Sequence, residues 1–401
     1  MVAGIRQLQA TGIQDVYLTK DPEMNVFQYH YFRYVNFAND LYKLHLNDTA
    51  SFNTKTFIQI PKKGHLLSKL YLHLKLPKLT KADGSYVCWV DTIGYAIFNA
   101  PIELQIGGVV VDKLYPVCMD MLDELKTSTN KMGHDRMILK SDIYRSGFHN
   151  AEKDVDLMIP LDFWFTKSYS MALPLLSMTN QDIQINFSFA DFSQLINYDG
   201  MTAPGRKDII ESNVFAEYIM LDDIILDHFQ GQKHQYIIQQ MVYNGDDIIP
   251  ANQNIFSTKL NFVNPCKELL FCCVDEDSTS NNNYFNYSRY SDEESLIQQA
   301  SLLLDGKHRY DDFLPEFIFR DFFPNIVHSV IPSKYLYTMP FALKPEDDQP
   351  TGSLNMSRFD EILLALRMNA NNPTCKLYVF GIMYNIVTIE NGGLTFEFLN
   401  V

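Results

Sequence analysis

The sequence KLYVFGIMYNIVTIENGGLTFEF, residues 376–398, joins a long apolar run to a glycine turn. Between residues 377 and 388 apolar side chains occupy both faces, as in a strand that is buried from both sides. The tripeptide Asn391-Gly392-Gly393 supplies residues that accept the positive φ angles of a tight reversal. Apolar and polar residues alternate after this turn. The chain is therefore predicted to end in a β-hairpin within a larger sheet.

Composition favours an all-β protein with two domains. The chain has 401 residues, enough for two domains of about 200 residues that each bury most of their apolar surface. Aromatic residues make up 13% of the chain, with 23 Tyr and 28 Phe against 2 Trp. Because flat side chains pack well on a pleated surface, this bias indicates sheets.

The charge balance argues against nucleic acid as a direct partner. The formal net charge of −15 repels a phosphate backbone unless a local basic patch overrides it. The pair Lys62-Lys63 and Arg145 are isolated cations, which is typical of a solvated surface. We therefore expect no direct nucleic-acid binding.

Cysteine usage and hydropathy predict a soluble protein made in a reducing compartment. The start of the chain is too polar for a secretory signal, and no apolar run approaches the ~18 residues that span a bilayer. Cys272 and Cys273 are neighbours on a predicted strand, so they point to opposite faces and cannot share one metal. Reduced, buried thiols are expected at all six positions, which are Cys88, Cys118, Cys266, Cys272, Cys273 and Cys375.

Alternation of apolar and polar residues predicts a series of short strands. They are expected at residues 52–60, 70–76, 89–97, 102–106, 109–114, 183–189, 214–221, 236–243, 254–262 and 269–274. A short helix is predicted at 120–126 and an amphipathic connector at 222–234. Residues 132–156 and 275–294 are polar, and both are predicted to be long exposed loops.

Several motifs resemble the major capsid proteins of the nucleocytoplasmic large DNA viruses. The family pattern Gln-Pro-Ser/Thr-Gly-Ser-x-Asn-x-Ser-Arg, which precedes a Tyr-rich strand and a final Phe strand, is filled by Gln349, Pro350, Thr351, Gly352, Ser353, Asn355, Ser357 and Arg358. Further similarity lies in GIQDVYLTKDPE, in WVDTIGYAIFNAPIELQIGG, and in PLDFWF followed by ALPLLSM. The matches occur in the family's order and extend over nearly the whole chain.

The resemblance implies a fold of two consecutive eight-stranded antiparallel jelly rolls, a double jelly roll with short connecting helices. We expect an N-terminal arm at residues 1–25, a first jelly roll at 26–226 and a second at 227–401. Apolar residues are scattered irregularly through the arm and bury little by themselves. The arm is therefore expected to dock on its own domain or on a neighbouring subunit.

The resemblance also implies a structural virion protein rather than an enzyme. Such proteins form homotrimers of hexagonal outline, and these capsomers tile an icosahedral capsid shell over an internal lipid layer. The expected partners are further copies of the chain, neighbouring capsomers and minor capsid proteins, with a membrane nearby but not spanned and surface glycans as an additional option. The expected location is the virion, after assembly in the cytoplasm of an infected host cell.

The sequence contains no recognisable catalytic or metal-binding motif. GxSxG, HExxH, a phosphate-binding glycine loop and CxxC are all absent. Asp275-x-Asp277-x-Thr279 begins like a calcium loop but continues with Ser280, where an EF-hand requires Gly. No catalytic residue, metal ligand or cofactor is therefore predicted.

Two alternative functions stay open at this point. One is a minor capsid paralogue of the same fold, and the other is a carbohydrate-binding jelly roll. The aromatic triplet Phe163-Trp164-Phe165 would suit a sugar platform, but core packing is the commoner role of such a cluster and is our interpretation.

Overall fold

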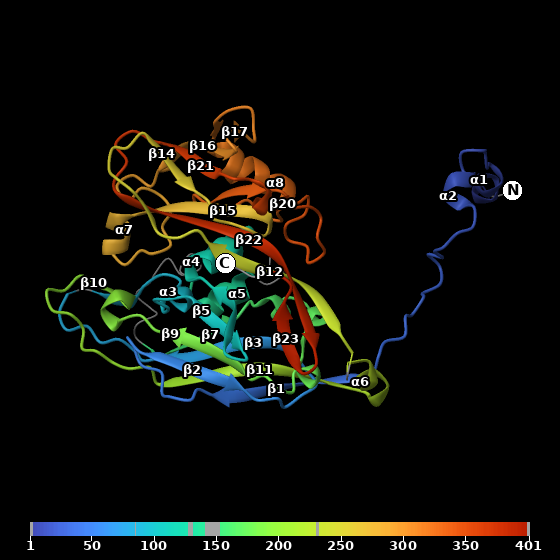
Figure 1. Ribbon diagram of the computed structural model, residues 1–401, viewed down its shortest axis with the longest axis horizontal. Helices are drawn as coiled ribbons and strands as arrows, with labels where there is room; N and C mark the ends of the chain where they lie inside the picture. Colours follow the sequence, from blue (N-terminus) through green and yellow to red (C-terminus); the bar gives the residue numbers. More distant parts are fainter. Residues whose placement is uncertain (1–2, 85, 127–130, 141–152, 230–231, 399–401) are drawn as a thin grey trace. The chain divides into compact units, whose positions relative to one another are not determined.

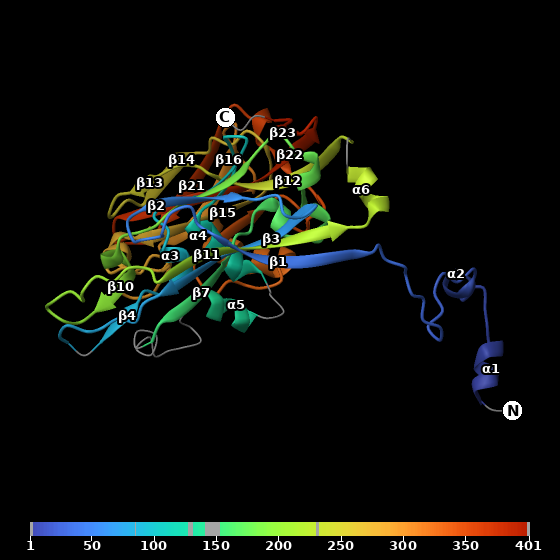
Figure 2. The same ribbon diagram turned by 90° about the horizontal axis from the view of Figure 1, so that it is seen from below.

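The structure is a computed structural model that describes residues 3–84, 86–126, 131–140, 153–229 and 232–398. The chain divides into a unit of residues 1–37 and a compact body of residues 38–401. The first unit contains two short helices, α1 (Ala3–Gln9) and α2 (Val16–Thr19), whose side chains are not buried. In the body, two β-sandwiches follow one another along the chain (Figures 1 and 2).

The first sandwich consists of two main sheets. One sheet has the order β1-β11-β3-β7, with β8 paired to β3, and its strands are β1 (Phe37–His45), β11 (Glu211–Leu221), β3 (Leu66–Leu76), β7 (Val155–Pro160) and β8 (Leu173–Pro174). The other has the order β2-β9-β5-β6, formed by β2 (Lys55–Ile60), β9 (Ile183–Ser188), β5 (Ile102–Ile106) and β6 (Val109–Leu114). A small ladder joins β4 (Val87–Trp89) to β10 (Ile196–Tyr198).

The second sandwich is built in the same way. Its larger sheet has the order β12-β22-β15-β19, with strands β12 (His234–Tyr243), β22 (Cys375–Glu390), β15 (Pro265–Asp275) and β19 (Tyr337–Pro340). Three short strands extend it, namely β13 (Asp247–Ile249), β20 (Leu354–Asn355) and β23 (Gly393–Phe396). The facing sheet contains β14 (Ile255–Lys259), β21 (Ile362–Met368), β16 (Ile297–Leu304), β17 (Lys307–His308) and β18 (Leu314–Pro315).

Both sandwiches have the strand order of a jelly roll. In each, the first strand pairs with the last long strand (β1 with β11, β12 with β22), and in the facing sheet the first strand along the chain pairs with the last one (β2 with β9, β14 with β21). All of the described registers are antiparallel, as this topology requires. The two halves of the chain therefore repeat one architecture, and the all-β double jelly roll expected from the sequence is confirmed.

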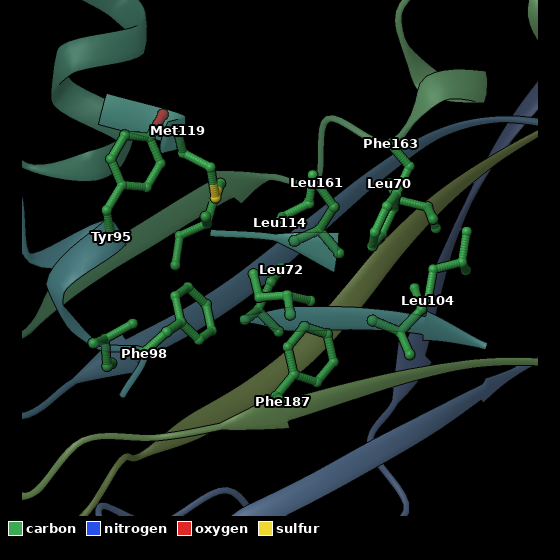
Figure 3. Packing of buried hydrophobic residues seen from close by; sticks show 14 of the residues in the cluster. Leu70, Leu72, Tyr95, Phe98, Leu104, Leu114, Met119, Leu161, Phe163 and Phe187 are labelled. Atoms are coloured by element: carbon green, nitrogen blue, oxygen red, sulfur yellow. The ribbon is translucent and has the colours of Figure 1, made fainter. Parts of the chain in front are cut away.

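The core of the first sandwich follows from the alternation in β3. Leu70 and Leu72 point inward, where they pack toward Leu104 of β5 and Phe187 of β9 (Figure 3). All four side chains are at most 1% exposed. Phe163 and its two aromatic neighbours are equally buried, so the prediction that this triplet is core is confirmed.

The long strand β15 is buried on both faces. Cys272 packs in the apolar cluster that is continuous with the first sandwich, whereas Cys273 packs in the cluster inside the second. Their predicted opposite orientation is thereby confirmed. All six cysteines are free thiols, and all but Cys88 are buried.

The C-terminal hairpin is present with the predicted turn, although one assignment was wrong. Asn391 and Gly392 have φ angles of 55° and 81°, and Gly393 pairs with Glu390 as the first residue of β23. A two-residue turn needs positive φ only at its two central positions. Gly393 is therefore an ordinary strand residue rather than part of the left-handed turn.

The strand predicted at residues 89–97 is wrong beyond Trp89. Residues Ile93–Ala96 form the short helix α3, which is completely buried. A Cβ on Gly94 would lie 2.9 Å from backbone and side-chain atoms of Ile138, at the end of α5 (Lys131–Ile138). The glycine therefore allows two short helices to pack closely, a tertiary reason that strand periodicity does not reveal.

The two predicted loops also differ from the structure. Residues 132–156 include most of α5, the buried Lys140 and the start of β7, while residues 141–152 lie outside the described part of the chain. Residues 275–294 contain α7 (Glu276–Ser280) and are anchored by Phe285 and Tyr287, which are 5% and 2% exposed. In the second segment, two scattered aromatic side chains are therefore buried despite the polar composition around them.

Candidate assembly surfaces

Helix α4 (Pro116–Leu125) lies at the junction between the two sandwiches (Figure 1), and its sequence carries three carboxylates. Pro116 begins the helix, where the missing N–H costs no hydrogen bond. Asp123 and Glu124 follow Asp120 by three and four residues. At these spacings the three side chains lie close together on one side of α4. Asp120 and Glu124 are only 0% and 2% exposed. Charged groups that are buried so deeply need partners.

Two basic side chains on or near α5 compensate these acids from within the first sandwich. Lys140 Nζ lies 2.6 Å from Glu124 Oε1 and 3.1 Å from Asp123 Oδ2. His134 Nε2 lies 3.1 Å from Asp123 Oδ1. Both side chains come from the segment that was predicted to be an exposed loop.

The second sandwich supplies the remaining partners. Lys334 Nζ donates to both carboxylate oxygens of Asp120 at 2.8 Å, and the Tyr287 hydroxyl donates to Asp120 Oδ2 at 2.7 Å. The backbone N–H and hydroxyl of Ser333 donate to Glu124 Oε2 at 3.2 and 2.8 Å. We call these eight residues the junction cluster: Asp120, Asp123, Glu124, His134, Lys140, Tyr287, Ser333 and Lys334. It ties the two jelly rolls together with charge-assisted hydrogen bonds.

The junction cluster stabilises the charged forms of its acids. Burial by itself raises the pKa of Asp123, but the hydrogen bond from His134 and the charge of Lys140 outweigh it and lower the pKa to about 2. Burial likewise opposes ionisation of Glu124, yet Lys140 and Lys334 bring its pKa down to about 2. For Lys140 the three acids overcome desolvation and raise the pKa. At neutral pH the cluster is therefore an assembled ionic contact.

A second polar contact crosses the junction at β12. Gln239 Oε1 accepts hydrogen bonds from Lys167 at 3.2 Å and from Lys267 at 2.7 Å. Burial and the nearby charge of Lys167 lower the pKa of Lys267 to about 7. Because the folded state lowers the pKa of Lys267, as it does for Asp123 and Glu124, protonation of this lysine as the pH falls also disfavours the folded state.

An aromatic cavity of 540 Å³ opens at the same junction. The Tyr115 ring of the first sandwich lies 5.5 Å from the rings of Tyr243 and Phe380 of the second. At the rim, the Tyr243 hydroxyl donates to Asp246 Oδ1 at 2.8 Å, and Lys376 Nζ lies 2.7 Å from the same atom. This aromatic cavity is formed by residues far apart in the sequence, so no local motif predicted it.

The residues considered for metal binding have structural roles. Asp275 caps α7, since its Oδ1 accepts from the N–H of Asp277 at 3.0 Å and its Oδ2 from the N–H of Tyr290 at 3.1 Å. Within the described residues, no group of three or more His, Cys, Asp or Glu side chains is arranged to hold a metal ion. In the same part of the chain, no helix is long and apolar enough to cross a membrane.

Exposed apolar side chains mark two candidate contact regions. In the N-terminal unit, Phe27, Tyr31 and Phe32 are 85–96% exposed. In the body, Phe317, Phe322 and Ile326 are 46–60% exposed. The latter three lie on or beside the helical segment η7 (Ile318–Phe322) and α8 (Phe323–Val327). Clustered exposure of this kind is typical of protein contact surfaces.

Comparison with known proteins gives a consistent result for both halves. Residues 25–222 match the family model described as the N-terminus of the major capsid protein, and residues 227–395 match the model described as the large eukaryotic DNA virus major capsid protein. The major capsid protein of Pyramimonas orientalis virus is 28% identical over 98% of each chain. That of Paramecium bursaria Chlorella virus 1 is 27% identical, covering 91% of this chain and 87% of the relative.

Solved structures show the same fold. The capsid protein in the quasi-atomic model of the PBCV-1 virus capsid superposes with a TM-score of 0.81 at 22% identity, covering 94% of this chain and all of that one. The Faustovirus major capsid protein gives a TM-score of 0.75 at 12% identity, covering 96% of both chains. The two family models together match most of the sequence, one over the first sandwich and the other over the second. Both sandwiches have the strand order of a jelly roll. The chain belongs to the major capsid protein family of the large eukaryotic DNA viruses.

Proposed function

We propose that this chain is the structural subunit of a virion shell, in which homotrimers act as capsomers that tile an icosahedral capsid. The observation that carries the proposal is the repeated jelly roll, because three chains with two equivalent sandwiches give six similar blocks around one axis. The family relationship supports a role in the capsid. The proposed arm of residues 1–25 and jelly rolls of 26–226 and 227–401 are the parts of this subunit.

The mass of the purified protein in solution tests this proposal. Light scattering is expected to give three times 46.4 kDa at micromolar concentration. A stable monomer under these conditions would contradict the trimer. Counting copies per particle in purified virions distinguishes a major capsid protein from a minor paralogue.

The proposed partners follow from the surface charge. A chain of net charge −15 does not neutralise DNA, so we propose contacts with neighbouring capsomers and with basic minor capsid proteins. An internal membrane would lie beneath this shell without being spanned by the chain. Assembly in the cytoplasm of the host cell belongs to the same proposal.

The aromatic cavity favours carbohydrate binding as a second candidate function. Tyr115 and Tyr243 are half-buried and line this cavity with aromatic rings against which a sugar would pack, next to the polar pair of Asp246 and Lys376. A glycan array with the purified trimer tests it. Selective binding that is lost in Tyr115→Ala would support this function, whereas no binding on the array would reject it.

A further inference from the structure

In each sandwich, one connection between strands contains helices. Only the helical connection of the first sandwich is buried against the other sandwich. In the first sandwich the connection between β6 and β7 contains α4 and α5, and α4 is buried against the second sandwich. In the second sandwich the connection between β17 and β19 contains η7 and α8. Its outer side chains Phe317, Phe322 and Ile326 are exposed by 59%, 46% and 60%. The second sandwich therefore has a helical connection equivalent to that of the first, but the outer side chains of this connection are exposed.

These three side chains form one stripe. Phe317 and Phe322 are separated by five residues across a π-helical turn, and Phe322 and Ile326 by four residues across an α-helical turn. Each spacing corresponds to about one turn of its helix type, so the side chains point the same way. The opposite side of the segment is anchored in the core, where the Phe319 ring lies 6.2 Å from that of Phe271. We call Phe317, Phe322 and Ile326 the outer stripe.

The two larger sheets show a matching asymmetry. In the second sandwich, Leu270, Cys272 and Phe380 of the β12-β22-β15-β19 sheet pack in the apolar cluster shared with the first sandwich. In the first sandwich, the equivalent sheet β1-β11-β3-β7 presents alternate residues to the outside. Tyr71 of β3 is paired with Phe215 of β11 on that face, and both are only half-buried.

Strand β1 extends this outer face with an exposed leucine. Asn39 Nδ2 donates to Glu217 Oε1 at 2.8 Å, and Lys43 is paired with Glu211, so both β1 residues lie on the face of these glutamates. Leu41 lies between them, on the same face by alternation, and is 62% exposed. Because the flanking polar groups already have partners, an apolar surface could cover Leu41 without leaving a buried charge unpaired.

We propose that the outer stripe of one chain covers the outer face of the β1-β11-β3-β7 sheet in the next chain. This contact between two chains repeats the junction between the two sandwiches of a single chain. The contact is head-to-tail, since it joins two different surfaces. Every outer stripe and every sheet face is covered only when the chains form a closed ring. This inference rests on the proposed trimer and names the surfaces that hold it together.

Charge substitutions on each surface test the proposal. Phe322→Asp and Leu41→Asp should each convert the trimer into a monomer in light scattering, because each places a carboxylate in an apolar contact. Leu343→Asp is the matched control, as Leu343 is 78% exposed and lies outside both surfaces. All three positions are exposed in the single chain, so the circular dichroism spectrum of every variant should match that of the wild type.

Mixing the two disruptive variants tests the head-to-tail arrangement. The Phe322→Asp chain keeps an intact sheet face and the Leu41→Asp chain keeps an intact stripe, so their mixture should form two-chain species that neither variant forms alone. A mixture that stays monomeric at concentrations where the wild type is fully trimeric overturns the arrangement.

The remaining outcomes separate this inference from the proposed function. A trimeric Phe322→Asp variant overturns the outer stripe as the contact, even if the wild type is a trimer. If only Leu41→Asp dissociates, another element covers the sheet, such as the aromatic residues of the N-terminal unit, and the inference is wrong. A monomeric wild type instead contradicts the proposed function itself.

Discussion

The turn that closes the C-terminal hairpin requires a left-handed backbone at Gly392. Its φ angle is 81°, and a Cβ would lie 2.7 Å from Thr179 Oγ1. We expect Gly392→Ala to reduce the free energy of unfolding by about 1–3 kcal/mol, because of backbone strain and this close contact. Urea unfolding measures the change. Gly393→Ala is the control, since its Cβ would meet only Gln181 at 3.4 Å, and an equal loss in both variants would contradict the turn geometry.

The ion pair between Lys334 and Asp120 is the strongest single candidate for a stabilising charge contact. Asp120 is completely buried, so Lys334→Met leaves its carboxylate with reduced compensation. We expect a loss of about 3 kcal/mol in the free energy of unfolding. Lys376→Met provides the comparison, because its partner Asp246 has 67% of its side chain exposed and such pairs contribute at most about 1 kcal/mol. Similar urea midpoints for the two variants would argue against a structural role of the junction cluster.

The sequence predicts single residues well where the reason is local. Asn391-Gly392 indicates a hairpin because these residues accept positive φ at little cost. By contrast, Asp120 and Lys334 are 214 residues apart, and nothing near either residue specifies the pairing. The aromatic cavity has the same origin, since Tyr115 and Phe380 meet only after both sandwiches have folded. Site geometry of this kind depends on tertiary packing.

At the scale of elements, α4 is expected to make the protein sensitive to acid. The pKa values of Asp123 and Glu124 are lowered to about 2 in the folded state, from ordinary values of 3.8 and 4.5. The unfolded chain therefore binds more protons below about pH 4.5. The stability that these acids contribute is present above that pH and is lost as the pH falls toward 2.

Glu124→Gln tests this linkage. The variant should be less stable than the wild type near pH 6, and the difference should shrink as the pH falls toward 2, where the wild-type carboxylate becomes protonated. Urea midpoints across this range give the comparison. Asp208→Asn should show almost no difference at any pH, because the Asp208 side chain is 61% exposed. A constant difference for Glu124→Gln over the whole range would mean that its ionisation is not linked to folding.

Most strands could be predicted from alternation, whereas short helices and covered loops could not. β3, β9 and β12 occur where apolar residues repeat every second position, because one side of each strand faces a core. α3 is too short for a helical period and is held by its buried surroundings. The segment of α7 was interpreted as exposed because Asn and Ser dominate it, although Phe285 and Tyr287 fix it against the first sandwich.

At the scale of the whole molecule, the chain is an asymmetric pair of similar blocks. The first sandwich covers the larger sheet of the second, while its own equivalent sheet keeps an exposed Leu41. The single chain also exposes the outer stripe, which we propose to cover this sheet in the next chain. The repeated strand order thus supports the proposed association, which composition and net charge alone do not indicate.

The same arrangement predicts how salt acts on assembly. The proposed contact within a trimer sets the apolar outer stripe against Leu41, and the polar groups beside Leu41 are paired within their own chain, so purified trimers should keep their mass in light scattering at ~0.5 M NaCl, where exposed ion pairs are largely screened. Contacts between trimers should be broad and polar, because a lattice that corrects its errors needs reversible edges, and they should weaken in the same buffer. With a net charge of −15, the trimer should also show no salt-sensitive binding to DNA. Dissociation of trimers by salt, or DNA binding with a steep salt dependence, would contradict this division between apolar and polar contacts.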